Sequence, residues 1–244
     1  MRNALACLLA IVLALGAESV AAQFNGSLIY QVDQNGNRLV MKYYQSGTNG
    51  KIEAYNVTLK NGVPDSTTMH AQDTIIFDFA AGTETHLQYH TMRAYKQQYM
   101  GSVINAALSA KLKSMGTVTV SGGGSDTANG YNCNHYVITS ASKLGTGTRD
   151  VWVSGSLGPS PTAWVVGSYL YFTPGYLHFT KLLAAGASGI VVKVNSSFTH
   201  QGLQYSMLLI GYDPHPPRQQ FFSVPSRYSV IDETNMTLPT GTGN

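Results

Sequence analysis

Three Asn-Gly dipeptides divide the first part of the chain into short runs rich in β-branched and aromatic residues. The dipeptides are 14 and 12 residues apart: Asn35-Gly36, Asn49-Gly50 and Asn61-Gly62. Both residue types tolerate positive φ, which a tight two-residue hairpin requires at its two central positions. The runs beside them, 27–32, 38–44 and 52–59, are therefore predicted to be antiparallel strands.

The predicted meander continues beyond these turns. In the run 73–79, Ile75, Phe77 and Phe79 share one face of a strand because side chains alternate with a period of two. Ala81-Gly82 is predicted to turn the chain into the next strand. Further strands are predicted over 83–90, 94–99, 117–121, 131–140, 148–154, 189–198, 202–212 and 219–230. The glycine-rich stretches 121–130 and 143–148 are predicted to be loops.

Two segments have helical periodicity instead. The first, 102–115, begins with a serine in the capping position and stops before Gly116. The second begins at Thr173-Pro174, ends at Gly186, and carries Tyr176, Phe179, Leu182 and Leu183 on one face. Each apolar face must be covered. The predicted fold class is therefore α+β, with a long, curved, unclosed antiparallel sheet wrapping about two helices.

The N-terminus has the pattern of a secretory signal peptide. Arg2 precedes an apolar run over 4–17, and small residues over 20–22 complete a cleavage site. Fourteen residues are too few to span a bilayer comfortably. We therefore expect a signal peptide at 1–22, one domain over 23–235, a flexible tail over 236–244, and a secreted or periplasmic protein that is not integral to the membrane.

Loss of the signal would remove Cys7 and leave Cys133 as the remaining cysteine. An internal disulfide is then impossible. No cluster of basic residues flanks Cys133 to lower its pKa. It is expected to be a small buried side chain.

Several functional classes lack support in the sequence. The 15 Lys and Arg residues are scattered, so no basic cluster suits nucleic acid. The sequence HLQYH (86–90) lacks the glutamate of a metalloprotease motif, and SGGGSD (121–126) lacks the lysine of a P-loop. No Gly-x-Ser-x-Gly elbow is present. We predict no metal, no cofactor and no enzymatic activity.

The motifs of the second half of the chain occur in a distinctive order. They are GYNCNHYVIT (130–139), RDVWVSGSLG (149–158), TPGYLHFTKLL (173–183) and FFSVPSRYSVI (221–231), after DTIIFDF (73–79) in the middle portion. In this order they resemble a family of uncharacterised secreted bacterial proteins, over roughly residues 70–231. That family is similar in fold to the periplasmic lipoprotein carriers of the LolA and LolB type. The resemblance implies an unclosed half-barrel that wraps helices and holds acyl chains beneath a helical lid.

Aromatic residues on the predicted strands are more numerous than one half-buried sheet requires. We predict a non-enzymatic exported protein that binds a lipid or acyl chain between the sheet and a helix lid. The predicted ligand-binding residues are Phe77, Phe79, Tyr89, Tyr136, Trp152, Tyr176, Phe179 and Leu183. An alternative is a structural or adhesive envelope module, whose aromatics serve the core or a protein partner. A hydrolase whose site is assembled only in three dimensions is a further alternative.

Overall fold

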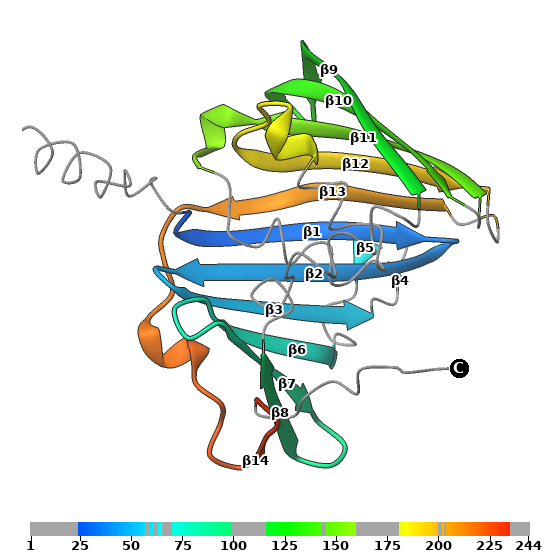
Figure 1. Ribbon diagram of the computed structural model, residues 1–244. Coiled ribbons are helices and arrows are strands. Elements are labelled where there is room, and N and C mark those ends of the chain that lie inside the picture. Colours follow the sequence, from blue (N-terminus) through cyan, green and yellow to red (C-terminus); the bar gives the residue numbers. More distant parts are fainter. Residues whose placement is uncertain are drawn as a thin grey trace, which may run out of the picture.

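The computed structural model describes residues 24–56, 59–60, 63–64, 70–98, 116–142, 145–159, 181–199, 202 and 204–234 (Figure 1). Outside these ranges lie the predicted signal peptide, the predicted helix 102–115, most of the second predicted helix and the predicted tail. The turn predicted at Asn61-Gly62 lies outside them as well.

One sheet of twelve strands organises the described residues. Its strands are β1 (Gly26–Gln34), β2 (Asn37–Ser46), β3 (Asn49–Asn56), β6 (His70–Asp78), β7 (Thr83–Gln88), β8 (Arg93–Gln98), β9 (Gly116–Ala128), β10 (Tyr131–Ser142), β11 (Gly145–Ser154), β12 (Ile190–Phe198), β13 (Gln204–Asp213) and β14 (Ser229–Asp232). A separate small sheet pairs β4 (Leu59–Lys60) with β5 (Val63–Pro64).

The strand order is β14-β8-β7-β6-β3-β2-β1-β13-β12-β11-β10-β9. Neighbouring strands are antiparallel except β14, which runs parallel to β8. β14 and β9 form the two borders, and Figure 1 shows the strands rotating strongly from one border to the other. The prediction of a large unclosed antiparallel sheet is confirmed. The two covering helices are not established within the described residues.

The Asn-Gly predictions have mixed outcomes. Asn35 and Gly36 have φ of 48° and 84°, as the predicted hairpin requires. The prediction for Asn49-Gly50 is wrong, because both residues already belong to β3 and the turn is at residues 47–48. Gly50 is needed for packing, since a Cβ there would lie 2.9 Å from the Phe79 ring.

The two predicted glycine-rich loops are largely strand. β9 continues through 121–128 and meets β10 at a further Asn-Gly turn, Asn129-Gly130. Gly122 and Gly123 have φ of 103° and 95°, where the register of β9 against β10 shifts at a bulge. Strand β11 likewise begins at Gly145. The glycine-rich composition predicted loops here because glycine is common both in loops and at bulges within strands.

The strand predicted over 219–230 is also wrong. This region forms a 3-10 turn over Gln219–Phe222, an irregular stretch, and only then β14. Pro225 interrupts the run, and proline cannot donate to a ladder. Residues 218–228, named the C-terminal strap here, bury Phe222 and Tyr228 against Ile76, Leu87 and Ala94 in a second hydrophobic cluster.

The main hydrophobic cluster covers one face of the sheet, which we name the core face. It is defined by buried side chains that share a face through the strand register: Val32, Tyr43, Ile75, Tyr136 and Val194. The opposite face is named the outer face, and it includes the cluster beneath the C-terminal strap. Cys133 is buried in the main cluster, as predicted, and burial raises the pKa of its thiol.

The described end of the second predicted helix covers 181–184. Leu182 is fully buried in the main cluster, whereas Leu183 is 43% exposed. Gly186, with φ of 86°, ends the helix as predicted, and its N–H donates to the Leu183 carbonyl. Within the part of the chain that the structure describes, no helix has the length and apolar character to cross a bilayer.

Candidate functional site

The core face carries the predicted ligand-binding residues of the first half of the chain. Phe77 lies opposite Gly50 of β3, and its ring stacks on Phe79 with centroids 5.6 Å apart and an interplanar angle of 10°. Phe77 is fully buried. Residues 74–79 alternate as the sequence predicted, so the pleat itself delivers both rings to the same face.

Tyr136 lies on the same face at the other end of the sheet. It is opposite Val151 of β11, which in turn is opposite Val194 of β12, and all three side chains are buried. Buried side chains thus extend along the core face from Phe77 on β6 to Tyr136 on β10.

Tyr89 and Trp152 are not brought to this face. Tyr89 shares a hydrogen bond of 2.5 Å between its hydroxyl and Thr74 Oγ1 and packs edge-on against Tyr228, so it belongs to the second cluster. Leu183 points to solvent, and Tyr176 and Phe179 lie outside the described residues. The described structure therefore gathers only Phe77, Phe79 and Tyr136 on the core face.

Trp152 lies on the outer face between two polar neighbours. The His135 ring stacks on it at 4.4 Å between centroids, and Lys193 Nζ lies 4.7 Å from the indole centroid. These residues sit opposite Trp152 on the two flanking strands. The indole N–H donates to Asp126 at 2.7 Å. This geometry occupies both sides of the ring with the protein's own groups.

Arg149 is a functional candidate that is absent from the predicted ligand-binding residues. It lies on β11 opposite Ser196 of β12, and it is only 6% exposed. Its Nε–H donates to Ser196 Oγ at 2.8 Å, and the guanidinium lies 5.8 Å from the Phe198 ring. No carboxylate among the described residues pairs with it. Arg149 lies two residues before buried Val151, so the alternation of side chains along β11 places both on the same face. This alternation was the signal in the sequence that could have identified Arg149.

Burial lowers the pKa of the Arg149 guanidinium by desolvation. Arginine nevertheless remains protonated at neutral pH. The core face therefore holds a positive charge among apolar side chains, and its described neighbours offer a hydroxyl and an aromatic ring rather than an anion.

A second polar group lies on the core face at the opposite end of the sheet. Glu84 of β7 sits opposite Phe77 and is fully buried. Its Oε1 accepts a hydrogen bond from Gln97 Nε2 at 2.6 Å and lies 3.0 Å from His86 Nε2. The core face thus carries two buried charged residues, Glu84 on β7 and Arg149 on β11, on opposite sides of the β1–β13 pair.

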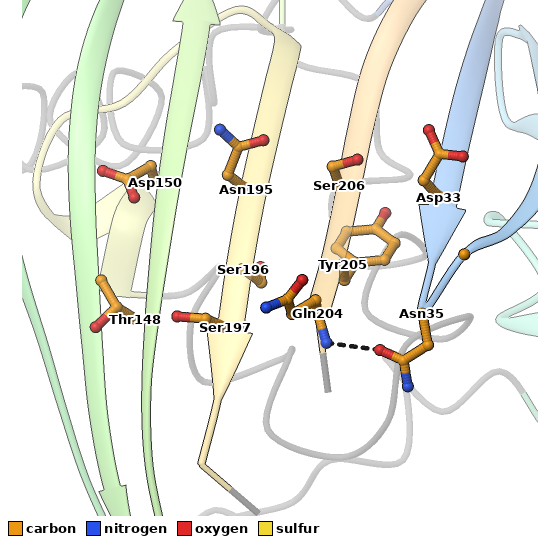
Figure 2. Close-up of a pocket in the computed structure, with 11 residues that line it drawn as sticks. Asp33, Asn35, Thr148, Asp150, Asn195, Ser196, Ser197, Gln204, Tyr205 and Ser206 are labelled. Carbon is orange, nitrogen blue, oxygen red and sulfur yellow. Dashed lines mark hydrogen bonds between the residues drawn. The ribbon is translucent and has the colours of Figure 1, made fainter. Parts of the chain in front are cut away.

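The outer face contains a polar groove of about 400 Å³ over β11, β12, β13 and β1 (Figure 2). Register places Asp150, Asn195, Ser206 and Asp33 in one row across these four strands. Figure 2 shows them pointing to the same side. The next row carries Thr148, Ser197 and Gln204, and Asn35 closes it at the β1–β2 turn.

The two carboxylates of this groove are held by neighbouring side chains. Asp33 accepts hydrogen bonds from Arg38 Nε at 2.7 Å and Gln31 Nε2 at 3.1 Å, and Asp150 Oδ1 lies 3.0 Å from His135 Nε2. Five further side chains make no hydrogen bond with the described part of the chain: Thr148, Asn195, Ser197, Gln204 and Ser206. The groove therefore offers unbonded hydroxyl and amide groups between two fixed carboxylates.

Comparisons with known proteins place the chain in a family without an assigned activity. A domain from Vibrio parahaemolyticus, described as an outer membrane lipoprotein-sorting protein domain, shares 7% identity at a TM-score of 0.32, covering 86% of this chain and 94% of the other. A DUF1329 family protein from Desulfovibrio piger shares 8% identity at a TM-score of 0.26, covering 86% and 93%. Both overlaps are loose and carry no functional argument.

No curated protein matches the chain. The sequence profile of one family, described as a domain of unknown function, matches residues 24–228. The prediction of an uncharacterised family is thereby confirmed, and the chain belongs to the DUF4412 family.

Proposed function

We propose that this protein is a non-enzymatic carrier or binding protein for an amphipathic lipid with an acidic head group. The acyl chain lies against the core face, and the head group pairs with Arg149. The observation that carries the proposal is a buried guanidinium with a hydroxyl as its hydrogen-bond partner on a largely apolar surface.

The physical reason is the cost of desolvating a charge. A buried ion without an opposite charge is unfavourable by several kcal/mol, and a bound carboxylate or phosphate would offset that cost through charge-assisted hydrogen bonds. An acyl chain would bury apolar surface at the same time. Arg149 on β11 and Phe77 on β6 are six strand spacings apart on the core face. At about 4.8 Å for each spacing, this distance is roughly 30 Å.

Most apolar side chains of the core face are buried in this conformation, so binding requires an opening. The segment that ends in helix 181–184 is the proposed lid, since Leu182 is buried in the main cluster while its neighbour Leu183 faces solvent. Tyr176 and Phe179, predicted on the same helix, are proposed to contact the acyl chain together with Phe77, Phe79 and Tyr136.

Displacement of a fluorescent fatty acid from the purified protein tests the proposal. Comparing a saturated fatty acid with the fatty alcohol of equal chain length distinguishes the head-group contact with Arg149 from the acyl-chain contact with the core face. With Arg149→Gln, we expect the affinity for the acid to fall about tenfold or more, which corresponds to the loss of one charge-assisted hydrogen bond of about 1.5 kcal/mol or more. The affinity for the alcohol should change little.

Arg38→Gln is the matched control, because Arg38 is half-exposed and pairs with Asp33 on the outer face. This variant should bind both ligands as the parent does. Absence of saturable binding of either ligand by the parent protein would contradict the proposal. Equal losses for acid and alcohol in Arg149→Gln would contradict the role of Arg149.

The polar groove supports a second candidate, an adhesive envelope module that binds a saccharide or another polyol. Its hydroxyl and amide side chains match the hydrogen-bonding groups of such ligands. Titration calorimetry with oligosaccharides tests this candidate. Binding should be lost in Asn195→Ala and Gln204→Ala but retained in Arg149→Gln, whose side chain lies on the other face.

A further inference from the structure

Strand β9 forms an open border of the sheet. It pairs with β10 on one side, and no strand within the described residues lies on its other side. Thr117, Thr119 and Ser121 are exposed. The outward backbone N–H and C=O groups of this border have no partner in the described part of the chain, so they form a template for another strand.

The first part of this border lacks the devices that usually protect sheet edges. Residues 116–121 contain no charged residue, no proline and no bulge, whereas the bulge at Gly122 and Gly123 and the charge of Asp126 come later in β9. The opposite border, β14, is only four residues long and carries Asp232, with Arg227 and Glu233 close by in sequence. The β14 border is therefore guarded against pairing along its length, whereas the β9 border is unguarded over 116–121.

The segment Thr117–Ser121 is complementary to itself. Val118 and Val120 lie on the core face, where they pack on the main cluster, and Thr119 lies on the outer face opposite Thr139 of β10. If two copies of TVTVS pair antiparallel about Thr119, each Val118 meets the other copy's Val120. Valine then faces valine on one side of the sheet, and hydroxyl-bearing residues face one another on the other side.

We propose that the protein forms a two-fold symmetric dimer by antiparallel pairing of β9 with β9 of a second copy, centred on Thr119. The pairing joins the two sheets and extends the core face across the axis. Beyond Ser121 the bulge at Gly122 and Gly123 bends the strand, which limits the paired segment. Because each copy uses its unguarded border, the assembly closes at two copies rather than growing.

The mass of the purified protein in solution, from light scattering on a sizing column, tests the proposal. The parent protein should have twice the mass of one chain. Thr119→Asp places two carboxylates opposite each other across the axis, and Thr119→Lys places two ammonium groups there, so each variant alone should be monomeric. An equal mixture of the two variants should dimerise again, because opposite charges now meet.

Thr139→Asp is the matched control. Thr139 lies on the same face one strand inward, and its Oγ1 shares the 2.6 Å hydrogen bond with Thr119 Oγ1, so both aspartate variants lose that bond. Only Thr119 is on the border. Thr139→Asp should therefore remain dimeric.

Disulfide crosslinking of cysteine variants tests the proposal if a charged variant does not fold. Residues directly opposite on antiparallel strands have Cα atoms about 4.5 to 5.5 Å apart, which suits a disulfide. Thr119→Cys should give a disulfide-linked dimer on mild oxidation, whereas Thr139→Cys should not, and Cys133 is buried. A monomeric parent, a dimer unaffected by Thr119→Asp, a mixture that stays monomeric, or failure of Thr119→Cys to crosslink would overturn the proposal.

Discussion

At the scale of single residues, the hydroxyls of buried tyrosines differ in how they are satisfied. Tyr30 is buried on the core face, and its hydroxyl donates to the Val191 carbonyl at 2.9 Å. Tyr228 is buried beneath the C-terminal strap, and its hydroxyl has no hydrogen-bond partner within the described residues. The same chemical group therefore stabilises the fold at one position and costs free energy at the other.

The matched pair Tyr30→Phe and Tyr228→Phe tests this difference. Tyr30→Phe should lower the free energy of unfolding by about 1 kcal/mol or more, because it leaves a buried carbonyl without its donor. Tyr228→Phe should leave the stability unchanged or raise it by up to about 1 kcal/mol. Urea unfolding followed by circular dichroism measures both. A larger loss for Tyr228→Phe than for Tyr30→Phe would contradict the assignment.

Gly50 makes a second prediction at this scale. Its missing Cβ makes room for the Phe79 ring, so Gly50→Ala should lower the free energy of unfolding by about 1 to 2 kcal/mol through overpacking. The loss should be smaller in a Phe79→Leu background, because the ring that causes the clash is absent. Gly124→Ala is the control, since a Cβ there meets nothing within 4 Å. Equal losses at both glycines would argue against the packing explanation.

At the scale of elements, sequence patterns predicted strands well where apolar residues recur every two positions. The alternation over 73–79 was sufficient for β6, although packing beneath the C-terminal strap buries its second face as well. Aromatic content alone misled the prediction for 219–230. Phe222 and Tyr228 are buried as the apolar pattern suggests, but by packing across the outer face rather than by joining the sheet.

The C-terminal strap should contribute to stability as a packed element. Phe222→Ala should lower the free energy of unfolding by about 3 kcal/mol, because it leaves a cavity over Ile76, Leu87 and Ala94. Val230→Ala, at a side chain that is 55% exposed on neighbouring β14, should change it by less than about 0.5 kcal/mol. Denaturant midpoints at a constant m-value measure both. A small effect of Phe222→Ala would show that the strap is not packed as described.

At the scale of the whole molecule, buried tyrosines link stability to alkaline pH. Burial raises the pKa of Tyr30 well above its ordinary range and, with the carboxylate of Glu53, raises that of Tyr44 to about 12. In the unfolded chain both hydroxyls titrate near about 10. Above that pH the unfolded chain therefore binds fewer protons than the folded protein. The contribution of these tyrosines to the free energy of unfolding is complete below about pH 10 and is lost as the pH rises further.

We expect the urea midpoint to be steady from about pH 8 to about pH 9 and to fall above about pH 10, with Tyr30 alone accounting for up to about 1.4 kcal/mol per pH unit. Tyr30→Phe, although less stable at neutral pH, should show a shallower fall. The slope of the midpoint against pH, measured for both proteins, checks this. Identical slopes would assign the alkaline loss to other groups.

The site was less predictable than the fold, and Trp152 and Arg149 show why. Periodicity gives the face of a side chain within its own strand, so it places Arg149 with Val151 and Trp152 on the opposite side. It does not show which face of each strand lies on the same side of the sheet as Phe77. That correspondence depends on register between distant strands, which is set by bulges such as those at Gly122 and after Trp152.

The sequence by itself determined the antiparallel strands, the Asn35-Gly36 turn, the end of the helix at Gly186 and the family, because each depends on local backbone preference or on short motifs. Only the tertiary structure decided that β1 and β13 join the two halves into one sheet, that β9 is left at a border, and that Arg149 is buried beside Ser196. Those features arise from contacts between residues far apart in the chain. Their free energy is gained only when the strands come together, so no local pattern encodes them.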